Sequence, residues 1–385
     1  MQGKAVVVGL GETEYYKHGQ SPISEFQLAV QSIQRAAEDA GLPTSELDGL
    51  ISYMDSRNSP LRLAAALGMD ELRWSNTPWA GGGNNSAAAV QLADAAVSGG
   101  YANYVVVFRA LAQGEFYRLG SSAGKYATSR GTTWGYPYGL ISPAQECGLH
   151  TKRWMHDNNV SQEVLANISL ACYYNAQLNP RAVRYGRPLT RETYYESRMI
   201  VEPFHLYDCC QENDGSTALI VTTPERAKDL KKGGVPIIAT AQGLGPEIGA
   251  YSYQKDWFPG TYLDNVGDMI WERSGAKPAD IDVVQMYENF TGPVAMALVD
   301  MGFCTADELK EFTGNGNLEG PEAKMPFNTS GGNIAEAYIH GLEMVNEAVR
   351  QVRGESTCQA KDVELSLAVG GPGYSPGSAI LFGAA

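Results

Sequence analysis

The chain has 385 residues, of which 44% are apolar and 19% are charged, a composition that excludes a disordered or fibrous protein. Its 43 acidic and 29 basic residues give a net charge of −14, which argues against a protein that binds nucleic-acid phosphates. No apolar stretch approaches the roughly 18 residues of a membrane span, so no membrane association is expected. The six cysteines lack zinc-binding spacing, and no secretory signal is recognisable. We therefore expect reduced thiols in a cytoplasmic protein without a metal site.

The first half of the chain alternates apolar runs with helical patterns. Apolar runs predict buried strands at 4–10, 48–54 and 103–108. Helical spacing predicts helices at 26–40 and 80–98, each followed by glycine, which commonly ends a helix. This β-α-β-α-β order predicts parallel strands joined by right-handed crossovers.

Residues 110–200 lack this alternation. They carry aromatic residues and glycine-rich turns, followed by helical patterns at 143–157 and 161–177. We interpret this region as an insertion, after which a strand at 216–222 resumes the sheet.

The second half repeats the first. Strands are predicted at 236–241, 280–287, 363–369 and 378–382, with a helix at 264–275 and a long helix from about residue 330 to 353. The segment SELDGLISYMD at 45–55 is similar to ADIDVVQMYEN at 279–289. We therefore expect an internal duplication with halves at 1–235 and 236–385.

Five segments in one order carry a resemblance that extends over nearly the whole chain. They are VVVGLGETEYYKHG near the N-terminus, VEPFHLYDCCQENDGSTALIVT at 201–222, YENFTGP at 287–293, FNTSGGNIAEAYIHG at 327–341 and AVGGPGYSPGSAILF at 368–382. Together they resemble the thiolase superfamily, in its sterol-carrier-protein thiolase-like branch, and most of all the steroid side-chain-cleaving aldolases. The resemblance implies an α/β protein with a duplicated β-α-β-α-β thiolase fold and an inserted loop domain.

The groups that thiolases use for acyl transfer are missing from these motifs. The position of the nucleophilic cysteine holds Trp79, the position of the catalytic histidine holds Tyr338, and the position of the second cysteine holds Ala368. Acyl transfer through a covalent thioester needs an activated thiol with a base beside it. Cysteine-dependent thiolase activity is therefore not expected.

The resemblance implies a retro-aldol reaction instead. The substrate class is a β-hydroxyacyl-CoA, a 17-hydroxy steroid side-chain thioester, and the products are a ketosteroid and propionyl-CoA. Coenzyme A is then part of the substrate, and no further cofactor is implied. The family pairs with a separate DUF35 protein, made of a zinc ribbon and an OB-fold, so a homodimer inside an α2β2 complex is expected. The apolar strand at 103–108 is predicted to lie at its two-fold axis.

Two tyrosines occupy catalytic positions of the family motifs. Tyr287 ends a predicted strand and Tyr338 replaces the histidine, so we expect them to move protons during the reaction. Backbone N–H groups at Trp79 and at Gly370 or Gly371 are expected to stabilise the thioester oxyanion. On a continuous helix, His340 would point about 200° away from Tyr338 and would not replace the lost histidine.

The remaining candidates are aromatic and polar neighbours of these positions. The expected substrate-binding residues are Trp79, Gly370, Gly371, Tyr251 and Tyr374, and the expected orienting residues are Glu288 and His340. Loss of the cysteines and histidine also fits a different class of protein, a non-catalytic acyl-CoA-binding or scaffold subunit. Phenols at two catalytic positions favour the enzyme.

Overall fold

Strands from both halves of the chain join into one sheet in the computed structural model, which describes residues 5–55, 57–79, 81–115, 135–245, 260–261, 263–371 and 376–384. The strands are β1 Val6–Glu12, β2 Tyr16–Lys17, β3 Gly49–Ile51, β4 Trp74–Asn76, β5 Val105–Ala112, β6 Met199–Val201, β7 Phe204–His205, β8 Asn213–Thr222, β9 Val235–Gly243, β10 Val283–Met286, β11 Leu365–Gly370 and β12 Gly377–Gly383. The helices are α1 Glu25–Ala40, α2 Pro60–Leu67, α3 Ser86–Ser98, α4 Pro143–Asp157, α5 Gln162–Ala176, α6 Arg191–Glu196, α7 Pro224–Ala227, α8 Leu263–Ser274, α9 Thr291–Asp300, α10 Leu309–Thr313, α11 Gly332–Ala335 and α12 Leu342–Arg353.

The strand order explains how the two halves meet. It runs β10-β11-β12-β9-β1-β8-β5-β3-β4, with β2 beside β8. Strand β1 pairs with β9 only through Val6 and Val7, and this short pairing joins the halves. The predicted parallel pairing is confirmed for β3 with β5 and for β10 with β11. Strand β1 does not neighbour β3, because β8 and β5 lie between them.

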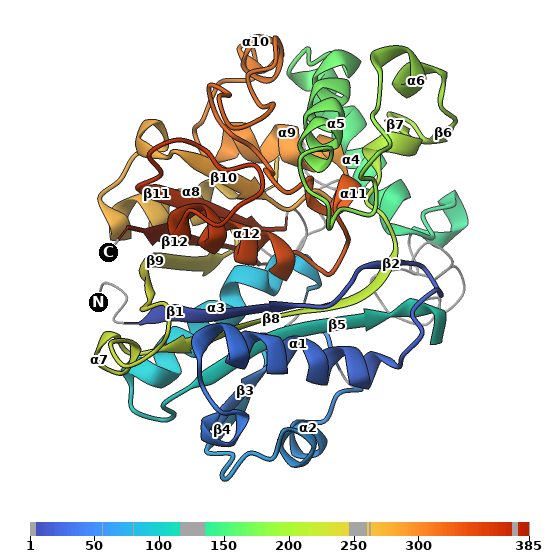
Figure 1. The fold of residues 1–385 in the computed structure, drawn as a ribbon. Helices are drawn as coiled ribbons and strands as arrows, with labels where there is room; N and C mark the ends of the chain where they lie inside the picture. Colours follow the sequence, from blue (N-terminus) through green and yellow to red (C-terminus); the bar gives the residue numbers. More distant parts are fainter. Residues whose placement is uncertain are drawn as a thin grey trace.

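Alternating side chains on the strands build separate apolar layers. In β5, Val105 and Val107 face α3 and α12, whereas Val106 and Phe108 face α1. In β12, Ile380 faces α3 and α12, whereas neighbouring residues pack in the cluster that contains α8 and α9. Helices α3 and α12 therefore lie between the two halves of this sheet, with α1 and α8 on the outer faces (Figure 1).

The position of β5 corrects the prediction for the strand at 103–108. We expected this strand to lie at a two-fold axis, but its two edges are already paired with β8 and β3 of the same chain. The sheet ends instead at β10 and at β4, a three-residue strand that its polar sequence did not suggest.

The predicted long helix at 330–353 is also wrong. Helix α11 stops at Ala335 and α12 starts at Leu342. Gly341 has a φ of +84° and His340 a φ of +57°, and left-handed backbone of this kind cannot continue a right-handed helix. Tyr338 and His340 consequently lie in a non-helical segment between two helices.

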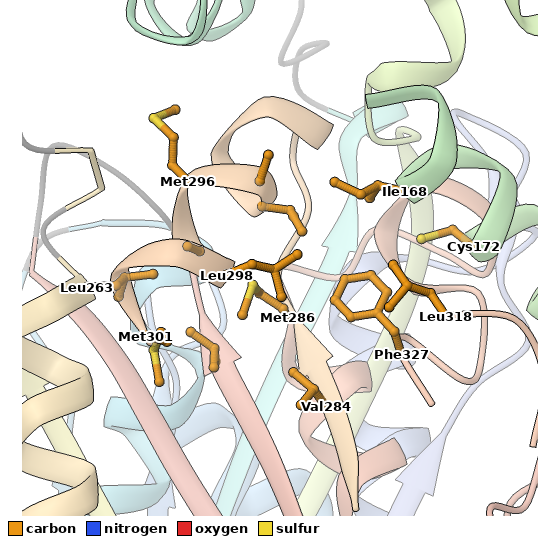
Figure 2. Packing of buried hydrophobic residues seen from close by; sticks show 14 of the residues in the cluster. Ile168, Cys172, Leu263, Val284, Met286, Met296, Leu298, Met301, Leu318 and Phe327 are labelled. Carbon is orange, nitrogen blue, oxygen red and sulfur yellow. The ribbon is translucent and has the colours of Figure 1, made fainter. Parts of the chain in front are cut away.

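Strand β10 is anchored firmly in the C-terminal half. Figure 2 shows Val284 and Met286 of β10 packed between Leu298 of α9 and Phe327. All four side chains are almost completely buried, so the residue that follows β10, Tyr287, starts from a fixed position. Within the described ranges, no helix combines the length and the apolar character needed to cross a bilayer.

Candidate active site

Two buried tyrosines from distant parts of the C-terminal half meet through their hydroxyl groups. The hydroxyl of Tyr287 donates a hydrogen bond of 2.9 Å to the hydroxyl of Tyr338. Tyr287 is held because its N–H donates to the carbonyl of Val369 in β11, at 3.0 Å. Tyr338 is held because its N–H donates to the side chain of Asn213 in β8, at 2.9 Å. The structure thus brings together the two residues expected to carry protons.

Glycines make the room that this phenol pair occupies. A Cβ atom at Gly83 would lie 2.0 Å from the Tyr287 ring, and a Cβ atom at Gly341 would lie 2.8 Å from it. Gly370 and Gly371 lie beside Gly83. A Cβ at Gly370 would come within 2.9 Å of the Gly83 carbonyl oxygen. Only glycine fits this close approach of backbone and ring.

The structure places Gly83, rather than Trp79, at the turn that precedes α3 and faces the tyrosines. Trp79 lies four residues earlier and its side chain is 85% exposed. Gly83, and not Trp79, therefore lies against the ring of Tyr287, and substrate binding by Trp79 stays a prediction. Tyr251 and Tyr374 lie outside the described residues.

Burial dominates the proton affinities of the site. It raises the pKa of both Tyr287 and Tyr338 well above the ordinary phenol value. For Tyr338, the donated hydrogen bond from Tyr287 and the charge of Arg109 act in the opposite direction and lower the pKa. Both phenols are therefore protonated in the resting protein, and Tyr338 is the member of the pair that the surroundings favour as the proton acceptor.

Glu288 connects the two segments that carry the tyrosines. One carboxyl oxygen accepts from the N–H of Ile334 at 3.2 Å, and the other accepts from the side chain of Asn333 at 3.2 Å. Burial raises the pKa of Glu288 to about 8, so the carboxyl is mostly neutral at pH 7. Glu288 fixes α11 against the end of β10, and through α11 it orients the segment that leads to Tyr338.

His340 lies beside Tyr338, which the prediction of a continuous helix did not anticipate. The two rings are 5.1 Å apart between centroids and meet edge to face. The Nε of Arg109 donates to Nδ1 of His340 at 3.0 Å. Burial lowers the pKa of His340 well below its ordinary value, and the charges of Arg109 and Arg57 lower it further. His340 is therefore a neutral imidazole.

Sequence reasoning missed Arg109, Gly83 and Glu343. Arg109 has the clearest sequence signal, because it is a lone charge inside the otherwise apolar strand VVVFRALA and only 2% of its surface is exposed. Glu343 accepts from the N–H groups of Ile339 and Gly341, so it stabilises the turn between Tyr338 and α12. Burial raises the pKa of Glu343 well above its ordinary value.

Known proteins share this architecture over the whole chain. Residues 247–382 match the family described as thiolase C-terminal domain-like. The chain is 36% identical, over 100% of both chains, to the 17-hydroxy-3-oxo-4-pregnene-20-carboxyl-CoA lyase of Mycobacterium tuberculosis. It is 38% identical to the steroid side-chain-cleaving aldolase of Thermomonospora curvata, over 100% of this chain and 99% of the relative. The chain belongs to the family of thiolase-like steroid side-chain-cleaving aldolases.

A solved structure agrees with this assignment. The Ltp2-ChsH2(DUF35) aldolase superposes with a TM-score of 0.92 at 37% identity, covering 100% of this chain and 98% of that one. The predicted thiolase fold and the predicted carbon–carbon lyase activity are confirmed. In this aldolase the tyrosine pair, the glycine turn and the neutral histidine form the candidate catalytic centre, which contains no thiol at the family's cysteine positions.

Proposed function

We propose that this aldolase cleaves a 17-hydroxy steroid side-chain CoA thioester into a 17-ketosteroid and propionyl-CoA. The observation that carries the proposal is the hydrogen-bonded pair of Tyr287 and Tyr338, two residues that lie in segments resembling catalytic motifs of thiolases. The substrate class is supported by relatives of the same length whose names specify steroid side-chain cleavage.

The reaction moves one proton and breaks one carbon–carbon bond. Because both phenols are protonated, the pair accepts the hydroxyl proton of the substrate only as it releases one of its own. The substrate proton moves to the oxygen of Tyr287, and the proton of Tyr287 moves along the hydrogen bond to Tyr338. The substrate oxygen forms the ketone as the bond to the α-carbon breaks. The electron pair of that bond moves into the thioester, which becomes an enolate. In the same relay the hydroxyl of Tyr338 gives its own proton to the α-carbon, so both phenols end protonated and propionyl-CoA forms.

This proton balance suits a buried pair of phenols. Burial makes an isolated phenolate unfavourable, because the pKa of Tyr287 and of Tyr338 is raised well above the ordinary value. A pair that accepts one proton while it releases another needs no lasting charge. Backbone N–H groups beside Gly83 and Gly370 are the donors we assign to the enolate oxygen, and each such donor contributes about 3–4 kcal/mol to the transition state.

We further infer a separate DUF35 partner and an α2β2 complex. The structural relative is a complex with a DUF35 protein, which supports the partner. Strands β4 and β10 end the sheet, and residues 326–328 already bond to the outer edge of β10, so we assign β4 as the edge through which two copies of the chain would pair. The described cysteines are all free, which is consistent with a reducing cytoplasm. Light scattering of the co-expressed proteins should give the mass of two copies of each, and a single copy of this chain would refute the dimer.

The decisive experiment supplies the substrate. The complex is incubated with 17-hydroxy-3-oxo-4-pregnene-20-carboxyl-CoA, and the products are identified by mass spectrometry. We expect equal amounts of the 17-ketosteroid and propionyl-CoA. Binding of the thioester without any product would instead identify the non-catalytic acyl-CoA-binding subunit.

A further inference from the structure

A buried chain of charged residues, Asp55 and Arg109, ends at His340. Asp55 lies 3.8 Å from a terminal nitrogen of Arg109, and Arg109 donates through Nε to His340. The exposed fractions of the Asp55 and Arg109 side chains are 1% and 2%. Because Arg109 lies in β5, the sheet itself fixes the position of its guanidinium.

This arrangement determines which nitrogen of His340 carries the proton. The guanidinium of Arg109 has only donors, so Nδ1 of His340 must be the acceptor of the 3.0 Å hydrogen bond. In a neutral imidazole the proton then lies on Nε2. A second proton on Nδ1 would point at the N–H of Arg109 and would place two positive charges in contact. Nε2–H is therefore a permanent donor, and His340 is not available as a base.

The backbone holds His340 in a conformation that few residues other than glycine adopt. Its φ is +57°, which is uncommon for histidine and costs about 1 kcal/mol or more. The hydroxyl of Tyr53 donates to the carbonyl of His340 at 2.8 Å and Gly341 follows with a φ of +84°. The fold thus stabilises an unfavourable backbone geometry that turns this imidazole toward the phenol pair.

The Nε2 atom lies beside the glycine turn of the active site. A Cβ atom at Gly82 would lie 3.5 Å from Nε2 of His340, so the glycine leaves space in front of this nitrogen. Gly83, the next residue, contacts the Tyr287 ring. None of the hydrogen bonds between described residues occupies Nε2. A neutral imidazole with a lowered pKa is a known type of electrophile, which polarises a carbonyl without transferring its proton.

We propose that Nε2–H of His340 binds the thioester oxygen of the substrate and stabilises the enolate that forms there. This inference rests on the proposed function and adds a third catalytic residue to it. The step transfers no proton from His340, since the imidazole contributes a hydrogen bond that strengthens as the oxygen becomes negative. Arg109 and Asp55 are positioning residues, because they act on the substrate only through His340.

Two substitutions distinguish the effect of the Nε2–H donor of His340 from the effect of its left-handed backbone. His340→Asn keeps the left-handed conformation, which asparagine tolerates well, but its short amide does not reach the position of Nε2. His340→Gln places an amide N–H near that position and offers its oxygen to Arg109. The control is His156→Leu, which removes a histidine whose side chain is 85% exposed on α4. Each variant is purified with the partner protein, and its thermal unfolding is compared with that of the wild type.

Two reactions are measured. The first is cleavage of the steroid thioester. The second is exchange of the α-hydrogens of propionyl-CoA with deuterium from D2O, which requires the enolate but neither the steroid nor bond cleavage. We expect His340→Asn to lower both rates by about 10²–10³-fold, His340→Gln to lower them by less than about 10-fold, and the control to match the wild type.

The outcomes distinguish this inference from the proposed function. Near-wild-type exchange in folded His340→Asn would overturn the assignment of the thioester oxygen, even where cleavage is lost. Equal losses in His340→Asn and His340→Gln would also overturn it, because a donor at Nε2 would then have no effect. A wild-type complex that exchanges propionyl-CoA but cleaves no steroid thioester would refute the proposed function, and the exchange rates of the variants would still decide the role of His340.

Discussion

Replacing each tyrosine of the pair with phenylalanine tests the phenol chemistry directly. Tyr338→Phe removes the oxygen that accepts the hydrogen bond of Tyr287, while the ring and its packing remain. The hydroxyl of Tyr287 is then buried without this partner, because only 4% of that residue is exposed. An unpaired buried hydroxyl costs about 1–3 kcal/mol, so we expect a loss of stability of that size. Tyr287→Phe leaves the hydroxyl of Tyr338 in the same situation.

The double variant distinguishes a pair from two independent groups. Removing both hydroxyls leaves neither hydroxyl of the pair unpaired, so the double variant should be at least as stable as either single variant. Proton transfer typically contributes about 10²–10⁴-fold to a rate, and we expect each single variant to lose kcat in that range. Because the two phenols act as a unit, the double variant should be little slower than the slower single variant.

The assay combines turnover with unfolding of the same preparations. Propionyl-CoA release is measured at saturating substrate, and thermal unfolding of the purified complex is followed in parallel. Tyr194→Phe is the matched control. Tyr194 lies in α6, and its buried hydroxyl donates to the carboxylate of Asp208 at 2.8 Å rather than to the phenol pair. This control should lose stability and keep kcat. Wild-type turnover in both Tyr287→Phe and Tyr338→Phe, with the fold intact, would refute the phenol mechanism.

Three further substitutions test the surroundings of the pair. Glu288→Gln should flatten the pH dependence of stability. A carboxyl with a pKa of 4.5 in the unfolded chain and about 8 in the folded chain stabilises the fold fully below pH 4.5 and loses that contribution as the pH rises through 8. At about 1.4 kcal/mol per pH unit the whole contribution is about 5 kcal/mol, of which urea unfolding between pH 5 and 8.5 should show about 4 kcal/mol in the wild type and much less in the variant. Gly83→Ala should displace the Tyr287 ring and lower kcat at least about 10-fold, whereas Gly68→Ala, strained by a φ of +64° but with no atom within 4 Å of its Cβ, should keep kcat despite some loss of stability. Trp79→Cys should give no thiolysis of a 3-ketoacyl-CoA, because that side chain is exposed and Tyr338 replaces the base; measurable thiolysis would contradict our account of the missing groups.

Much of the fold follows from local patterns in the sequence. Apolar runs such as VVVGL and VVVF form strands because both of their faces are buried, and the similar segments at 45–55 and 279–289 place Tyr53 and Tyr287 at equivalent strand ends. The position of Tyr287 was therefore predictable. The sequence also showed the glycines of the site, although it did not show which residue before α3 faces the ring.

The segment between α11 and α12 was not predictable from local patterns. NIAEAYIHGLEMV has good helix formers at helical spacing, so local propensity favours one continuous helix. Tertiary contacts override it, because Gly341 must approach the Tyr287 ring and the N–H groups of Ile339 and Gly341 bind Glu343. The contact of His340 with Arg109 joins residues 231 positions apart, so only the folded chain reveals it.

The same burial that suits the phenols excludes thiol chemistry from this site. Cys210 packs against the cluster that contains Tyr287 and Tyr338. Burial raises the pKa of Cys210 well above the ordinary thiol value, and the neighbouring acidic groups raise it further. A thiolase needs a thiolate, and hence a charge that this pocket disfavours. A retro-aldol reaction only relocates a proton from oxygen to carbon, so neutral phenols and a neutral imidazole donor are sufficient for it.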